Sequence, residues 1–255
     1  MGRIHYQLKK RIYRLKAYRR KGFGVHSPFT FHLISNVIEA KLQYYAFAVL
    51  SPYRKVVANG LKVKMKEKVV EKELVKRFKE EIHVMESSEA LDRLQFRLHN
   101  FWPTKKPAYF GGGIGFSMLY MAKIDSRIDV TCLGREAIFS KHINNIYKSD
   151  VGVTNYKDVD YYSLVRQKPA FDFLVFSERT SSDILTDFLN NIDLLVDEEC
   201  MILVQNPHRN ENLAFFWKQL KQLERFSVSL DLFHLGILIA RKGMQKQDYV
   251  RKYRF

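Results

Sequence analysis

Apolar residues recur at helical spacing in the N-terminal part of the chain. Ile4, Leu8, Ile12 and Leu15 follow one another at intervals of three and four residues, with basic residues between them. This pattern predicts a basic amphipathic helix at the start of the chain. Further helices are predicted at residues 28–39, 44–57 and 88–101, with a solvated Lys- and Glu-rich helix or connection at residues 62–81.

From Pro107 onward, short apolar runs alternate with helical patterns, which is typical of a βαβ series and a mostly parallel sheet. The predicted strands are residues 108–110, 129–133, 153–156, 171–176 and 201–204, and the predicted helices are residues 116–123, 136–147, 182–195 and 211–223. Two further strands, residues 226–232 and 235–240, are separated by very little chain. Because a parallel crossover needs a dozen or more residues, we expect these two strands to be antiparallel.

Composition excludes several classes of protein. The chain has 255 residues, of which 46% are hydrophobic, so it is globular rather than disordered. The two cysteines, Cys132 and Cys200, lie in apolar runs, which excludes a disulfide scaffold and a Cys/His zinc cluster. No apolar run approaches the roughly 18 residues of a membrane span, and no signal peptide is indicated. We therefore expect a cytoplasmic protein.

The net charge of +16 is concentrated in the N-terminal part of the chain. Residues 1–40 carry nine Lys or Arg and one acid, residues 41–106 carry fifteen and eight, and residues 107–255 carry nineteen and eighteen. The three net charges are +8, +7 and +1, which add to +16. We predict a basic helical N-terminal extension, residues 1–106, and a nearly neutral α/β domain, residues 107–255.

A glycine loop follows the first predicted strand of the α/β domain and opens a helix. Its sequence, Gly111-Gly112-Gly113-Ile114-Gly115, has the spacing GxGxG. Glycine lets the backbone turn sharply and approach a ligand, and a helix N-terminus offers free N–H groups. The spacing differs from the dinucleotide fingerprint, and the Lys-Ser/Thr pair of a P-loop is absent. The loop indicates a ligand site, with a tight turn that binds nothing as the alternative.

Three further segments accompany this loop: residues 21–31 (KGFGVHSPFTF), residues 43–45 (QYY) and residues 231–236 (DLFHLG). Together the four segments resemble class I S-adenosylmethionine (SAM)-dependent methyltransferases, specifically bacterial methyltransferase-like proteins with a helical N-terminal extension. The resemblance covers nearly the whole chain. It implies an α/β, Rossmann-like methyltransferase fold with a seven-stranded, mostly parallel sheet and one antiparallel strand.

The resemblance implies SAM as the cofactor. The candidate cofactor-binding residues are Gly111, Gly113, Gly115, Gly134, Glu136 and Asp158. Gly134 stands where the family has its ribose-binding acid, and Glu136 is the nearby acid that could replace it. Asp158 is a candidate contact of the adenine amino group, with an ordinary solvent-facing loop acid as the alternative.

Several acids of the family are replaced in this chain. Tyr109 stands before the glycine loop, Ser177 follows the fourth strand, and Gln205 and Asn206 replace the paired acids that hold a divalent metal in related O-methyltransferases. Because hard cations prefer carboxylates, we expect no metal site. His208 keeps its family position and is the candidate catalytic residue, with a loop histidine of no function as the alternative.

Two functions stay open at this point. A hydrogen bond to a charged group contributes about 1.5–3 kcal/mol, so the loss of the ribose carboxylate weakens cofactor binding about ten- to hundredfold. The first is a SAM-dependent methyltransferase-like protein with a degenerate cofactor and metal site, for which O-methyl transfer is one option. The second is a catalytically inactive binding protein of the same fold, and functions unrelated to either are the remaining alternative. The sequence identifies neither the small-molecule methyl acceptor nor the oligomeric state.

The basic N-terminal helix favours an anionic partner, either a membrane surface or nucleic acid. Because no RNA-binding signature accompanies the helix and one apolar stripe suits a bilayer surface, we favour the membrane. The protein would then be peripheral at the inner membrane face. The alternative is a solvated basic face whose apolar stripe packs on the domain.

Overall fold

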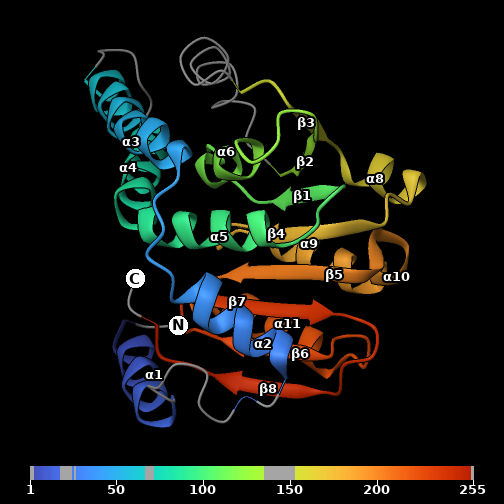
Figure 1. Cartoon of the computed structure of the whole chain (residues 1–255). Coiled ribbons are helices and arrows are strands. Elements are labelled where there is room, and N and C mark those ends of the chain that lie inside the picture. Colours follow the sequence, from blue (N-terminus) through green and yellow to red (C-terminus); the bar gives the residue numbers. More distant parts are fainter. Residues whose placement is uncertain (1–2, 18–24, 26, 67–71, 135–152, 254–255) are drawn as a thin grey trace.

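One eight-stranded sheet runs through the computed structural model, which describes residues 3–17, 25, 27–66, 72–134 and 153–253 (Figure 1). The strands are β1 (Pro107–Phe110), β2 (Val130–Leu133), β3 (Tyr156–Val159), β4 (Phe171–Phe176), β5 (Val196–Gln205), β6 (Val228–Asp231), β7 (Leu235–Ala240) and β8 (Gln247–Val250). The helices are α1 (Arg3–Lys16), α2 (Pro28–His32), α3 (Tyr45–Lys64), α4 (Lys72–Ser87), α5 (Glu89–Phe101), α6 (Phe116–Ala122), α8 (Tyr161–Gln167), α9 (Ser182–Asn190), α10 (Ile192–Leu195) and α11 (Glu211–Gln222). A π-helical segment, η1 (Leu33–Ile38), continues α2.

The strand order across the sheet is β3-β2-β1-β4-β5-β7-β6-β8. β7 runs antiparallel to both of its neighbours, and the other neighbouring pairs are parallel. The mostly parallel sheet with one antiparallel strand is therefore confirmed, as is the antiparallel pair near the end of the chain. The sheet has one strand more than the seven expected. The additional strand, β8, lies at the sheet edge and alternates half-buried and exposed residues, so it has no apolar run that could reveal it.

Helices cover both faces of the sheet. α5 and α6 lie over one face, and α9, α10 and α11 cover the other (Figure 1). Side chains of β4 alternate between the two layers: Phe173 and Val175 belong to the first core, whereas Leu174 and Phe176 belong to the second. Because such a strand buries both of its faces, β4 is a continuous apolar run in the sequence.

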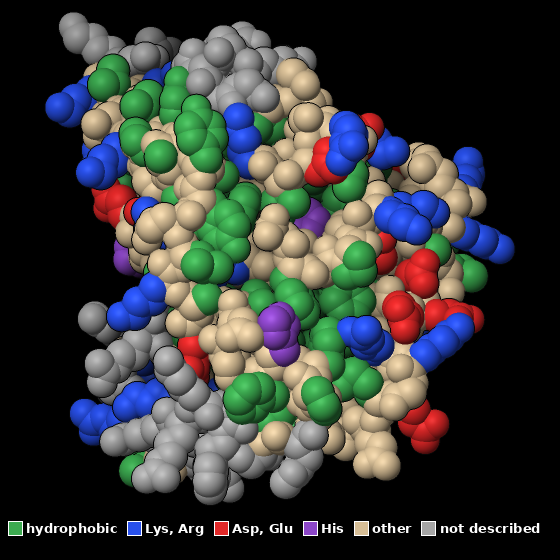
Figure 2. All heavy atoms as spheres, in the orientation of Figure 1, with side chains coloured by type: hydrophobic (Ala, Val, Ile, Leu, Met, Phe, Trp, Pro, Cys, Tyr) green, Lys and Arg blue, Asp and Glu red, His purple; other side chains and the backbone are tan. Residues whose placement is uncertain are grey.

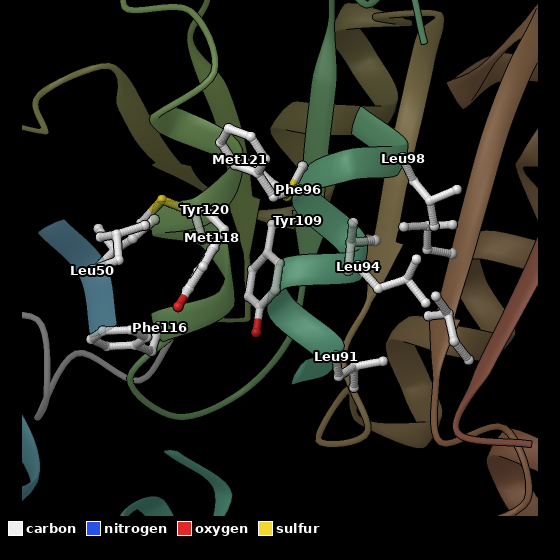
Figure 3. Close-up of a cluster of buried hydrophobic side chains, with 14 of the residues drawn as sticks. Leu50, Leu91, Leu94, Phe96, Leu98, Tyr109, Phe116, Met118, Tyr120 and Met121 are labelled. Atoms are coloured by element: carbon white, nitrogen blue, oxygen red, sulfur yellow. The ribbon is translucent and has the colours of Figure 1, made fainter. Parts of the chain in front are cut away.

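The N-terminal helices share a core with the sheet. Leu50 of α3, Leu94 of α5 and Phe116 of α6 lie in one buried cluster with Tyr109 of β1. Figure 3 shows the Tyr109 ring between α5 and α6. The predicted boundary between residues 106 and 107 marks a change of charge and of secondary structure, and the hydrophobic core continues across it.

A buried ion pair and its hydrogen bonds connect three of these helices. The guanidinium of Arg54 (α3) contacts the carboxylate of Asp92 (α5), and both side chains are almost completely buried. Asp92 also accepts hydrogen bonds from Ser88 Oγ at 3.0 Å and from Ser117 Oγ of α6 at 2.5 Å. Because an unpaired charge in this place would cost several kcal/mol, the network fixes how α3, α5 and α6 pack.

The helices of the Lys- and Glu-rich region differ from the predicted ranges. α3 continues to Lys64, and α4 then begins at Lys72 and ends at Ser87. The prediction of a solvated helix with few apolar residues is wrong for α4, because Phe78, Ile82 and Met85 form a buried face.

Two further outcomes concern later helices. α8 is not among the predicted helices, and the helix expected at residues 136–147 lies outside the described residues.

β3 begins at Tyr156, three residues later than the expected start at Val153. The residues before the strand are held by the side chain of Asn155. Its Nδ2 donates hydrogen bonds to the backbone carbonyls of Ala122, Asp125 and Ile128, at 2.8 to 3.1 Å. These hydrogen bonds hold the chain at Asn155, directly before the strand begins.

His99 of α5 makes the stability of the fold depend on pH. Its ring is buried and stacks on Phe173 of β4 with centroids 4.3 Å apart, and burial lowers the pKa of His99 to about 3. In the unfolded chain, histidine takes up a proton near pH 6.5. Between these two pKa values only the unfolded state binds the proton, so stability is lost as the pH falls. We expect this group to lower the free energy of unfolding by about 1.4 kcal/mol per pH unit between about pH 6 and pH 4.

Urea unfolding across this pH range measures the slope. The His99→Phe variant keeps an aromatic ring against Phe173 and removes the titrating group. Its slope should be smaller than that of the wild type by the contribution of one proton. An equal slope in both proteins would show that other groups cause the destabilisation by acid.

Candidate functional site

The carboxyl ends of the central parallel strands meet at one edge of the sheet. β1 ends at Phe110 and continues into the glycine loop, β4 ends at Phe176, and β5 ends at Gln205. Open α/β sheets bind ligands at this edge, outside the carboxyl ends of the strands. The structure therefore places the glycine loop and the segments that contain Ser177 and His208 on the same side of the molecule.

The glycine loop joins β1 to α6 in a conformation that requires glycine. Gly113 and Gly115 have φ angles of 75° and 70°, in the left-handed region that other residues rarely adopt. Gly111 lies against the segment after β4, since a Cβ at Gly111 would be 2.5 Å from Ser177 Cβ. A backbone hydrogen bond of 2.7 Å from Ser177 N to Phe110 O holds the two segments together. Contacts within the protein are thus sufficient to explain Gly111.

A carboxylate from α4 lies on the face of the glycine loop. Glu81 is buried, and its Oε2 accepts a hydrogen bond of 3.2 Å from the backbone N–H of Ile114. Its Oε1 pairs with the guanidinium of Arg179, which lies in the segment after β4. A Cβ on Gly113 would collide with Glu81 Oε1 and would lie 2.8 Å from Arg179 Nη1. The Glu81–Arg179 pair therefore fills the space beside Gly113, in a region where backbone N–H groups attract anions.

A cavity of about 270 Å³ lies between α4, the start of α5 and the ends of β4 and β5. Its lining residues are Tyr6, His83, Val84, Ser87, Ser88, Leu91, Glu178, Gln205, Asn206, Arg209 and His234. Burial raises the pKa of Tyr6, so the phenol remains protonated at neutral pH. Carboxylate, amide, imidazole and phenol groups thus surround one space large enough for a small molecule.

Hydrogen bonds connect the polar groups along one wall of this cavity. Asn206 Nδ2 donates to Glu178 Oε2 at 2.6 Å, and Asn206 Oδ1 lies 2.8 Å from His234 Nδ1. His234 Nε2 lies 3.0 Å from Lys10 Nζ of α1. Because a lysine ammonium only donates hydrogen bonds, His234 Nε2 accepts, and Nδ1 carries the proton that is donated to Asn206. The imidazole is held in one tautomer, and α1 contributes to the wall.

His208 follows β5 and contacts Asp231 near the cavity. Its Nε2 lies 2.8 Å from Asp231 Oδ2, and its ring packs against Phe233 and Tyr13 with centroids 5.2 and 6.3 Å apart. His234, which the sequence analysis did not single out, lines the cavity instead. The assignment of His208 as the catalytic residue stays a prediction.

Comparison with known proteins shows which fold this is. No protein-family model matches the sequence, and no curated protein matches it. A methyltransferase from Geobacter sulfurreducens is similar in structure at 12% identity, with a TM-score of 0.50 over 75% of this chain and 89% of that one. An O-methyltransferase from Bacillus cereus in complex with S-adenosylhomocysteine (SAH) gives 12% identity and a TM-score of 0.52, over 82% and 96% of the two chains. The O-methyltransferase TomG from Streptomyces achromogenes, in complex with SAM, is 11% identical. Its TM-score is 0.51 over 78% of this chain and 91% of that one.

The chain has the fold of class I SAM-dependent methyltransferases. This result agrees with the resemblance found in the sequence, and at these identities it concerns the fold alone. At three of the positions where the resemblance predicts an acid, the side chains of this protein make contacts within the protein. Tyr109 is buried in the core, and Ser177 Oγ accepts a hydrogen bond of 3.2 Å from Arg179 N. Gln205 Nε2 donates to Gln95 Oε1 at 2.9 Å.

The other predicted cofactor contacts have different outcomes. Gly134 directly follows β2 with a φ of 84°, and a Cβ there would lie 3.2 Å from the carbonyl oxygen of Gly111. Asp158 was expected after the third strand, but it lies within β3, paired with Cys132 of β2 and exposed to solvent. Glu136 lies outside the described residues. The roles of Gly134, Glu136 and Asp158 in cofactor binding stay predictions.

Sequence reasoning missed Glu81 and Arg179. Glu81 lies in the stretch that was interpreted as solvated, yet it follows Phe78 by three residues and directly precedes Ile82. A carboxylate at that spacing falls on the apolar face of the helix, and a charged group there indicates a partner in the core. Arg179 has no such signal, because it lies in a loop.

The contact between Gly113 and Glu81 can be tested by a double-mutant cycle. Gly113→Ala should lower the free energy of unfolding by more than about 2 kcal/mol, because the new Cβ strains a left-handed backbone and collides with Glu81. In a Glu81→Ala background the collision with Glu81 is absent and only the close approach to Arg179 remains, so the same substitution should cost about 1 kcal/mol less. Gly60→Ala in α3 is the matched control, since a Cβ there has no atom within 4 Å. Equal costs in both backgrounds would contradict the contact.

A second test concerns divalent metal ions. Among the described residues, no group of three or more His, Cys, Asp or Glu side chains is placed to hold a metal ion. Calorimetric titration with Mg²⁺ or Ca²⁺ should give no saturable heat, because neutral amides at Gln205 and Asn206 suit a hard cation poorly. The Gln205→Asp/Asn206→Asp double variant, which restores two carboxylates, is the matched comparison. Saturable binding by the wild type would contradict the prediction.

Proposed function

We propose that the protein is a SAM-dependent methyltransferase-like protein that takes up SAM at its glycine loop in competition with Glu81. The observation that carries this proposal is the loop itself. It joins β1 to α6 at the carboxyl edge of a methyltransferase-fold sheet, with Gly113 and Gly115 in left-handed conformations. Three features oppose tight binding: the replaced acids, the Glu81–Arg179 pair and the close packing around Gly111 and Gly134. The expected affinity is therefore low.

The loop would hold the cofactor through its backbone. The N–H of Ile114 is presented to an anionic group, and Glu81 now satisfies it. A ligand carboxylate would make the same hydrogen bond, so the side chain of Glu81 must leave the loop before the ligand can enter. Arg179 would remain available as a counter-charge for the incoming carboxylate.

The cavity at the ends of β4 and β5 is the proposed acceptor site. When bound, SAM supplies an electrophilic methyl group carried on sulfur. Transfer to an oxygen acceptor needs a group that takes the hydroxyl proton. Glu178 lines the cavity, is half-buried, and accepts a hydrogen bond from Asn206, which holds its carboxylate in place. We assign proton acceptance to Glu178 and orientation of the acceptor to His234 and Tyr6.

Calorimetric titration with SAM and SAH tests the proposal. Glu81→Ala should raise the affinity for both ligands by about tenfold, because the competing carboxylate and its buried ion pair are removed. Glu86→Ala, which alters an exposed carboxylate of the same helix, should leave the affinity unchanged. Gly113→Val should abolish binding in either background, since its side chain covers the loop.

The alternative is a catalytically inactive protein that retains the fold. It is favoured by the same features that oppose tight binding, above all the internal pairing of Glu81 with Arg179. The titrations test the cofactor binding that the first function requires. Absence of heat with SAM and SAH in the wild type and in the Glu81→Ala variant would refute cofactor binding and support the inactive protein.

A further inference from the structure

Helix α1 contacts the rest of the protein through its aromatic side. The Tyr13 hydroxyl donates hydrogen bonds to the backbone carbonyls of Asp231 and Arg251, the latter at 2.7 Å. The rings of Tyr6 and Tyr13 pack on Phe233, with centroids 5.4 and 5.0 Å apart. These contacts set the rotation of the helix about its axis.

The opposite side of α1 carries the aliphatic stripe. At 100° per residue, Leu8, Ile12 and Leu15 lie within about 60° of one another and roughly opposite Tyr6 and Tyr13. Their exposed fractions are 54%, 45% and 87%. The alternative that this stripe packs on the domain is therefore wrong for these three residues. An amphipathic helix thus turns its aliphatic face to solvent, where it lowers solubility unless something covers it.

The charge of α1 indicates what covers this face. The helix has six basic residues and no acidic residue over residues 3–16. Among its described side chains, Arg11 is exposed and Lys9 is half-buried, and both flank the aliphatic stripe in sequence. Figure 2 shows Lys and Arg side chains at the lower left, where Figure 1 places α1. A helix with an aliphatic face and flanking cations fits the interface of an anionic bilayer.

We propose that α1 attaches the protein to anionic membrane surfaces by laying Leu8, Ile12 and Leu15 into the lipid interface. This inference is independent of the proposed cofactor function. Nucleic acid fits the face less well, because bases stack on aromatic side chains and Tyr6 and Tyr13 point toward the protein. Attachment is peripheral: among the described helices, none is long and apolar enough to cross a bilayer.

Vesicle co-sedimentation of the full chain tests the proposal. The wild type should bind vesicles of equal parts phosphatidylglycerol and phosphatidylcholine at low salt, bind pure phosphatidylcholine much more weakly, and dissociate at about 0.5 M salt. The Leu8→Gln/Ile12→Gln/Leu15→Gln variant should bind the anionic vesicles at least about tenfold more weakly. Arg11→Gln should weaken binding about fivefold.

Two controls make the result specific. Val56→Gln/Val63→Gln changes two exposed aliphatic residues of α3 and should leave vesicle binding unchanged. Thermal unfolding should be nearly the same for the wild type and both variants, because all five side chains are exposed. Three outcomes would overturn the proposal: no vesicle binding by the wild type at low salt, equal binding by the triple variant, or tighter binding to an oligonucleotide duplex that the triple variant retains.

Discussion

The buried carboxylate of Asp92 is the constraint on which the arrangement of this molecule depends. A charge in the core must be paired, and Asp92 is paired with Arg54 of α3 and accepts a hydrogen bond from Ser117 of α6. Three helices from both sides of residue 107 are thereby fixed against one face of the sheet. Because α4 is separated from α5 only by Ser88, the position of α5 also limits where α4 lies. Glu81 reaches the glycine loop as a consequence of this packing.

The fold was predictable from the sequence because its signals are local. The apolar runs of β4 and β7 and the periodicity of α5 are contained in short windows, and the short connection between β6 and β7 requires an antiparallel pair. β8 and α8 escaped prediction because neither has a long apolar run. Asn155, directly before β3, makes hydrogen bonds to carbonyls about thirty residues away in sequence, and contacts of that range are not visible in a local pattern.

The candidate site was predictable only in part, because many of its contacts join residues that are far apart in the sequence. The glycine loop could be identified along the chain. The contact between Glu81 and Ile114 joins residues 33 positions apart, and the contact between Lys10 and His234 joins residues 224 apart. The sequence also did not show which side of α1 packs on the domain, since a helix with both an aliphatic and an aromatic side can pack by either. The aromatic side packs on the domain because the Tyr13 hydroxyl donates hydrogen bonds to two backbone carbonyls there.

The glycines of the loop make room for side chains of the protein itself, whereas their spacing in the sequence indicates room for a ligand. Glycines in such loops are usually attributed to the close approach of a ligand. Here Gly111 makes room for Ser177, and Gly113 makes room for Glu81. The protein thus satisfies the backbone N–H of Ile114 with its own carboxylate. In the proposed function, SAM and the side chain of Glu81 compete for the same site. The affinity for SAM would then depend on how strongly Arg179 and the packing of α4 hold Glu81 at the loop.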